Sequence, residues 1–135
     1  MSRMTMGTSP HAEPFWKATE ERKLVIQYSP ETGRYWHYPR EAVVVSPKTG
    51  EVEWRESSGR GTVYACSVMR KPGNPGMAAD VPYVVAIVEL EEEKVRMLTN
   101  VVNCEPESVK VGMKVKLTWD ELPKGRNLPV FEPAE

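Results

Sequence analysis

Two short stretches place hydroxyl side chains, a proline and a glycine at a spacing that zinc-binding cysteines often have. They read Ser29-Pro30-Glu31-Thr32-Gly33 and Ser46-Pro47-Lys48-Thr49-Gly50. With cysteine at Ser29, Thr32, Ser46 and Thr49, the region would have the pattern of a zinc ribbon, in which two hairpin turns share one tetrahedral ion. Serine and threonine hydroxyls stay protonated near neutral pH and bind zinc poorly. The sequence therefore predicts the turns without the metal.

A ribbon without its metal needs another source of stability, because a structural zinc adds on the order of 10 kcal/mol to a small fold. Seven of the eleven aromatic side chains lie in residues 1–58: Phe15, Trp16, Tyr28, Tyr35, Trp36, Tyr38 and Trp54. Burial of apolar area stabilises by roughly 25 cal/mol per Å². We therefore expect a zinc-free ribbon held by packed rings. The alternative is that Ser-Pro-x-Thr-Gly is simply a good turn sequence in an unrelated pair of hairpins.

The cysteines are the other side chains that could do chemistry. Cys66 and Cys104 lie in apolar surroundings and can form at most one disulfide. A catalytic cysteine needs an activating base, and the sequence places neither His11 nor His37 near a cysteine. We expect partly buried free thiols, and an enzyme that uses Cys66 or Cys104 is the alternative. The stretch Gly59-Arg60-Gly61 is too short to indicate a phosphate loop.

The elements that would position these residues are mostly strands. The pattern predicts a short helix over residues 13–23 and strands around the two turns, at 24–28, 34–38, 41–45 and 51–54. After a small polar boundary at 56–62, further strands are predicted at 62–69, 83–90, 95–102, 114–119 and 128–133. Five strands with short connections favour a closed barrel of the OB-fold type, and a sandwich is the second choice.

The predicted fold class is therefore mainly β. We expect a flexible leader at 1–12, a short helix with degenerate zinc-ribbon hairpins at 13–58, and a five-stranded OB-fold barrel at 59–135. No apolar run reaches the roughly 20 residues that span a bilayer, and the first residues lack the apolar core of a signal peptide, so we expect a cytoplasmic protein. The net charge of −1 argues against a nucleic-acid partner, although OB-folds often bind single strands and this stays the alternative function.

The whole chain from Phe15 to Pro133 resembles one family. The similar segments, in order, are FWKATEERKLVIQ, YPR, SGRGTVYACSV, PYVVAIVEL, LTNVV, VGMKVKLTW and LPVFEP. They resemble the domain of unknown function 35 family, whose members combine a rubredoxin-like zinc ribbon with an OB-fold and associate with acyl-CoA enzymes. The sequence departs from the family pattern at Ser29, Thr32, Ser46 and Thr49, which stand at the four cysteine positions.

This resemblance implies a non-catalytic accessory subunit in a hetero-oligomer. Its expected partner is a thiolase-like catalytic subunit: a thiolase, a thiolase-like aldolase or an acyltransferase. The expected role is to dock on that subunit and to help accommodate the acyl-CoA substrate. No tightly bound cofactor, zinc, nucleic acid or membrane is expected, and a CoA thioester would lie at the partner interface.

Two groups of residues are candidates for these contacts. Arg70 and Lys71 begin a long Pro- and Gly-containing loop at 70–82, and either they contact CoA phosphates or they are a solvated pair at a strand end. Met77 in the same loop either lines an acyl path or covers the open end of the barrel. Trp36, His37 and Tyr38 either face the partner or belong to the aromatic packing.

Overall fold

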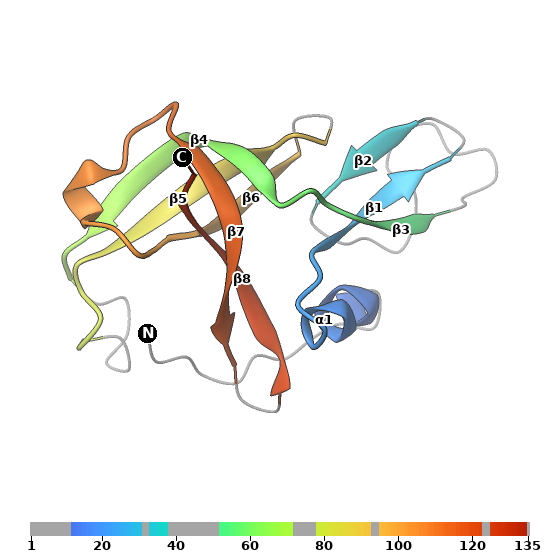
Figure 1. The fold of residues 1–135 in the computed structure, drawn as a ribbon, viewed down its shortest axis with the longest axis horizontal. Coiled ribbons are helices and arrows are strands. Elements are labelled where there is room, and N and C mark those ends of the chain that lie inside the picture. The colour runs from blue at the N-terminus through green and yellow to red at the C-terminus, as the bar shows by residue number, and fades with distance from the viewer. Residues whose placement is uncertain are drawn as a thin grey trace.

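The computed structural model describes residues 12–30, 33–37, 52–71, 78–92, 95–122 and 125–134. Helix α1 (Glu13–Thr19) precedes a three-stranded sheet made of β1 (Val25–Ser29), β2 (Arg34–Trp36) and β3 (Glu53–Glu56). The chain then forms a closed five-stranded barrel, which confirms the predicted fold class, and Figure 1 shows the small sheet beside the barrel. No helix among the described residues has the length and apolar character that a membrane span requires.

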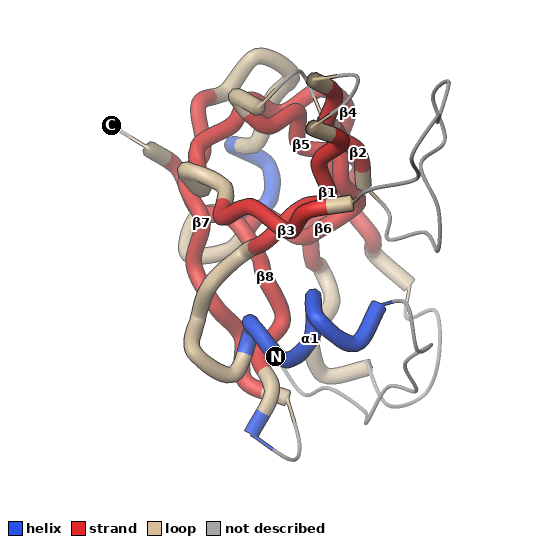
Figure 2. Tube along the Cα trace, turned by 90° about the vertical axis from the view of Figure 1, so that its right-hand side faces the viewer, coloured by secondary structure: helices blue, strands red, loops and turns tan. Residues whose placement is uncertain are grey.

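The barrel strands follow the order β4-β5-β6-β8-β7. They are β4 (Arg60–Met69), β5 (Tyr83–Leu90), β6 (Arg96–Val101), β7 (Lys114–Glu121) and β8 (Asn127–Pro133), and the short helix η3 (Pro106–Ser108) lies between β6 and β7. Neighbours are antiparallel except where β6 meets β8, through the parallel pair Val101↔Phe131 that closes the barrel. Figure 2 shows the barrel strands from a second side. Closure removes the exposed strand edges that an open sheet would present.

Alternating side chains fill the barrel. Along β5, Val84, Ala86, Val88 and Leu90 are buried, as expected for a strand with one face in a core. Phe131 from β8 is fully buried at the centre of this core. At Gly61 in β4, an added Cβ would lie 2.6 Å from Val88 Cγ1 and 2.8 Å from Glu89 O, so only glycine fits between β4 and β5.

Helix α1 is shorter than the sequence predicted. Phe15 and Thr19, one turn apart, form its buried face. The helix ends because Arg22 takes a left-handed conformation with φ of 58°. The backbone bonds Lys23 N→Ala18 O (3.1 Å) and Arg22 N→Thr19 O (2.9 Å) then complete a Schellman motif. Residues 20–23 favour a helix locally, and this capping turn overrides that preference.

In the small sheet, β1 lies between β2 and β3. The first predicted turn joins β1 to β2, and its Gly33 has the positive φ, 71°, that the turn requires. The rings of the cross-strand partners Tyr28 and Tyr35 lie 4.6 Å apart, and the Arg55 guanidinium lies 3.6 Å above the Tyr28 ring. The second turn, at 46–50, lies outside the described residues.

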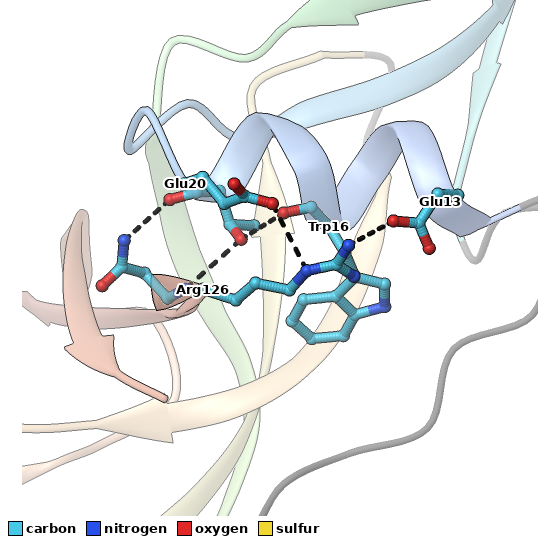
Figure 3. A network of polar contacts seen from close by, with 6 residues as sticks. Glu13, Trp16, Glu20 and Arg126 are labelled. Atoms are coloured by element: carbon cyan, nitrogen blue, oxygen red, sulfur yellow. Dashed lines mark hydrogen bonds and ion pairs between the residues drawn. The ribbon is translucent and has the colours of Figure 1, made fainter. Parts of the chain in front are cut away.

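Two polar networks join the helix and the small sheet to the barrel. In the first, which we call the helix–β8 contact, Asn127 Nδ2 donates to Thr19 O (2.8 Å) and its N–H donates to Thr19 Oγ1 (3.3 Å). Arg126 reaches from the same end of β8 to the carboxylates of Glu13 and Glu20 on and just after α1 (Figure 3).

The second network holds the segment between β3 and β4. Glu92, in the β5–β6 turn, accepts hydrogen bonds from the Ser57 hydroxyl (2.7 Å) and from the Ser58 N–H (2.8 Å). Burial alone would raise the pKa of the Glu92 carboxyl, but these hydrogen bonds together lower it. Both networks therefore set the orientation of the N-terminal part relative to the barrel.

Candidate functional site

A pocket with a volume of about 460 Å³ opens on the outside of the barrel where β4 meets β7. It is lined by Ser58, Gly59, Arg60, Lys116, Leu117 and Ala134, and we call it the cationic pocket. Arg60 and Lys116 are direct cross-strand partners, so their side chains leave the same face of the barrel. Among the described residues, the lining therefore has two cations and no carboxylate.

Glycine makes this close approach of β4 and β7 possible. Gly59 has φ of 76°, and an added Cβ would lie 2.9 Å from Leu117 Cβ. The Leu117 N–H donates to Gly59 O at 2.7 Å. This bond brings the start of β4 against β7. Arg60, the next residue in the chain, is therefore placed opposite Lys116.

The charges at the pocket are only partly compensated. Lys116 Nζ lies 3.8 Å from Glu132 Oε2, and the other oxygen of that carboxylate accepts a hydrogen bond from Asn103 Nδ2 (2.6 Å). Within the described ranges, the Arg60 guanidinium makes no hydrogen bond or ion pair. Lys114 lies next along the same face of β4 and β7. Its ammonium donates to Thr62 Oγ1 (3.1 Å) and is a third cation on this face.

A second surface is apolar. A groove of about 280 Å³ crosses β5, β6 and β8, and its walls include Tyr83, Val85, Leu98 and Leu128. Leu98 is 57% exposed and lies in this groove together with the other apolar walls. Exposed apolar surface of this kind is typical of sites that bind another molecule.

Of the residues predicted to bind CoA or the acyl chain, Arg70 is already paired. Its guanidinium forms an exposed ion pair with Glu107 from η3. Lys71 is exposed beside it, and Met77 lies outside the described residues. The structure brings Arg70 and Lys71 together at the end of β4, away from the cationic pocket at the start of that strand.

Of the residues predicted to bind a partner, Trp36 ends the edge strand β2 of the small sheet and His37 follows it. Trp36 is 9% exposed, and its Nε1 donates to Gln27 Oε1 at 2.5 Å, as expected for aromatic packing within the sheet. The His37 ring lies 5.4 Å from the Phe15 ring, and burial lowers the pKa of His37 to about 4. Tyr38 lies outside the described residues.

Of the four positions that match zinc ligands, the structure describes Ser29. It is fully buried at the end of β1, and its carbonyl accepts the Gly33 N–H at 2.8 Å. Thr32, Ser46 and Thr49 lie outside the described residues. In the described part of the chain, no three His, Cys, Asp or Glu side chains gather as a metal site would require.

The half-buried Cys66 and the described histidine lie in different surroundings. Cys66 is half-buried, and its thiol faces Val109 O at 3.8 Å. His37 is the one histidine in the described ranges, and it lies against Phe15 of the helix. The described residues therefore contain no cysteine–histidine pair of the kind that activates a nucleophile.

Arg60 and Lys116 are the residues that sequence reasoning missed. They are far apart in the chain, and only the register of β4 against β7 brings them together. The sequence did indicate a cationic face on this strand, because Lys114 and Lys116 are two residues apart and such residues share one face of a strand.

Comparisons with known proteins agree with this architecture. The family described as "ChsH2, C-terminal OB-fold domain" matches residues 54–120. A solved chain from the "Ltp2-ChsH2(DUF35) aldolase" is 33% identical, with a TM-score of 0.86 over 97% of this chain and 100% of that one. A "DUF35 domain-containing scaffold protein" of Methanocaldococcus jannaschii is 33% identical over 77% of this chain and 73% of its own length.

These likenesses define a class of proteins with an OB-fold domain. The chain belongs to the DUF35 family. A "probable enoyl-CoA hydratase alpha subunit" of Thermomonospora curvata is also similar, with 39% identity over 89% of this chain. This chain spans 37% of the length of that relative.

Proposed function

We propose that this protein is a non-catalytic accessory subunit of an acyl-CoA-processing enzyme complex. Its role is to dock on a catalytic subunit and to help accommodate the CoA thioester. The observation that carries this proposal is the likeness, over nearly the full length of both chains, to a chain of the Ltp2-ChsH2(DUF35) aldolase. The similarity to a hydratase alpha subunit also points to an acyl-CoA reaction.

The partner in this proposal is a thiolase-like enzyme: a thiolase, an aldolase of the same fold or an acyltransferase. Two features of the surface support a binding role. The apolar groove with exposed Leu98 can bury area against another protein, and the cationic pocket can hold an anionic group. In this complex, CoA would lie at the interface, and the N-terminal part would need no zinc.

The test is co-expression with the thiolase-like enzyme that is encoded nearest to this chain. The two proteins should elute as one hetero-oligomer in size-exclusion chromatography, and acyl-CoA turnover should fall when this chain is left out. A double Cys66→Ser, Cys104→Ser variant serves as the control for activity of the chain itself. It should support full turnover, since neither thiol has a base in the described structure.

Two results would reject the proposal. One is separate elution of the two proteins at micromolar concentration together with unchanged turnover. The other is turnover of acyl-CoA by this chain alone that disappears in the double cysteine variant.

A further inference from the structure

The cationic pocket contains an arrangement that is unfavourable in the free protein. Arg60 and Lys116 stand directly opposite each other on antiparallel strands. Like charges at such positions repel and destabilise the sheet. Glu132 is the cross-strand partner of Lys116 on its other side and lies 3.8 Å from it, so it balances part of the lysine charge, whereas no described carboxylate contacts Arg60. An anion between the two cations would remove this repulsion.

We infer that the cationic pocket binds a phosphate group, with the Arg60 guanidinium and the Lys116 ammonium as its ligands. In the complex proposed above, that phosphate belongs to the CoA part of the acyl-CoA substrate. This second statement rests on the proposed function, whereas phosphate binding by the pocket does not.

The side chains fit phosphate better than other anions. The planar fork of an arginine can donate two parallel hydrogen bonds to phosphate oxygens, and a lysine adds a mobile point charge. The pocket is concave and about 460 Å³ in volume, which is large enough for a phosphate and part of its substituent. A flat acidic protein surface would contact the rim and leave the pocket unfilled.

The neighbouring charges are compatible with this assignment. Glu92 is held by Ser57 and Ser58, and Glu91 accepts from the Ser58 hydroxyl at 3.2 Å. Neither carboxylate lines the pocket. Arg70 is paired with Glu107, as Lys116 is with Glu132, whereas the Arg60 guanidinium has no carboxylate partner among the described residues.

The experiment is isothermal titration of the full chain, alone and in its complex with the catalytic subunit. The probes are CoA, dephospho-CoA, pantetheine and inorganic diphosphate. The test variant is Arg60→Gln with Lys116→Gln. The matched control is Lys23→Gln with Lys110→Gln, which removes the same charge at exposed positions outside the pocket.

We expect the test variant to weaken CoA binding at least about tenfold, because charge-assisted hydrogen bonds are lost. The control variant should bind CoA as the wild type does. Inorganic diphosphate should compete with CoA, pantetheine should not, and wild-type affinity should fall as salt is added. Since Arg60→Gln removes a repulsion, the test variant should melt no lower than the control, which separates lost binding from unfolding.

Several results would overturn the inference. These are CoA binding that is unchanged in the test variant, pantetheine competing as well as diphosphate, or no CoA binding by the wild type either alone or in the complex. Binding of a single-stranded oligonucleotide that CoA cannot displace would assign the pocket to nucleic acid instead. If the complex fails to form but the chain binds CoA through Arg60 and Lys116, the proposed function fails and the phosphate site stands.

Discussion

At the scale of single residues, Glu92 shows how one carboxylate can hold two parts of the chain together. Its pKa is lowered because the Ser57 hydroxyl and the Ser58 N–H donate to the ionised form, which outweighs the cost of burial. A carboxyl with a lowered pKa stabilises the fold above its unfolded pKa, ordinarily about 4.3 for Glu. That contribution is lost as the pH falls through the folded pKa.

We therefore predict that Glu92→Gln lowers the free energy of unfolding at pH 7 and makes it less dependent on pH in the acid range. Urea titrations of wild type and variant at pH 7, 5 and 3.5 would measure this. The difference between the two proteins should shrink toward the lowest pH. A constant difference across the series would show that the loss is one of packing and not of charge.

Gly61 carries a second prediction at this scale. Gly61→Ala would force a Cβ to within 2.6 Å of Val88 Cγ1 and 2.8 Å of backbone Glu89 O, so β4 and β5 must separate. Overpacking of this kind costs about 1–3 kcal/mol. Gly125→Ala is the comparison, because its Cβ would meet nothing within 4 Å and only the positive φ of 79° opposes it. Equal losses of thermal stability in the two variants would contradict the predicted close approach.

At the scale of elements, the helix–β8 contact joins α1 to the barrel through buried groups. Thr19 is fully buried and Asn127 is 6% exposed. Asn127→Ala removes one donor to the Thr19 carbonyl, which keeps its hydrogen bond from the Arg22 N–H. We expect a loss of about 0.5–1.5 kcal/mol, the net contribution of one hydrogen bond, and faster hydrogen exchange in α1.

Arg126→Gln is the matched control for this contact, since it breaks neighbouring ion pairs that are partly exposed. Such pairs contribute little, so its effect should be the smaller of the two. If hydrogen exchange in α1 responds more to Arg126→Gln than to Asn127→Ala, the ion pairs are the main connection and the prediction is wrong.

Some elements could be predicted from the sequence, and others could not. The strand at 83–90 was predicted with the bounds that the structure shows, because its apolar run and flanking turns are local signals. The end of α1 was missed, since the capping residue is Arg22 and no glycine or asparagine marks the turn. The parallel closure of β6 on β8 and the Arg60–Lys116 pair depend on contacts between distant residues, which local patterns do not contain.

At the scale of the whole molecule, the N-terminal part and the barrel share one core. Phe15, Leu24 and Ile26 belong to the same buried cluster as Val63 and Phe131 of the barrel. This shared core packs the N-terminal part against the barrel. Within the small sheet, Trp36 contacts Gln27, and Tyr28 contacts Tyr35. The zinc-free ribbon remains a hypothesis, because three of its four key positions lie outside the described residues.

We predict that the purified protein contains no zinc and that a strong chelator leaves its melting temperature unchanged. Atomic absorption and a thermal melt with and without the chelator would measure this. The reason is that hydroxyl side chains cannot replace the thiolates that hold a structural zinc. One tightly bound zinc per chain, or a chelator-induced loss of structure, would refute the hypothesis.

The central claim is that this chain contributes binding and leaves the chemistry to another subunit. The most direct measurement is acyl-CoA turnover by the purified thiolase-like enzyme that we propose as the partner, as this chain is added in increasing amounts. We predict that turnover rises and reaches a plateau at a fixed ratio of the two chains, while this chain alone shows no turnover. Turnover that stays flat through the whole titration would contradict the account.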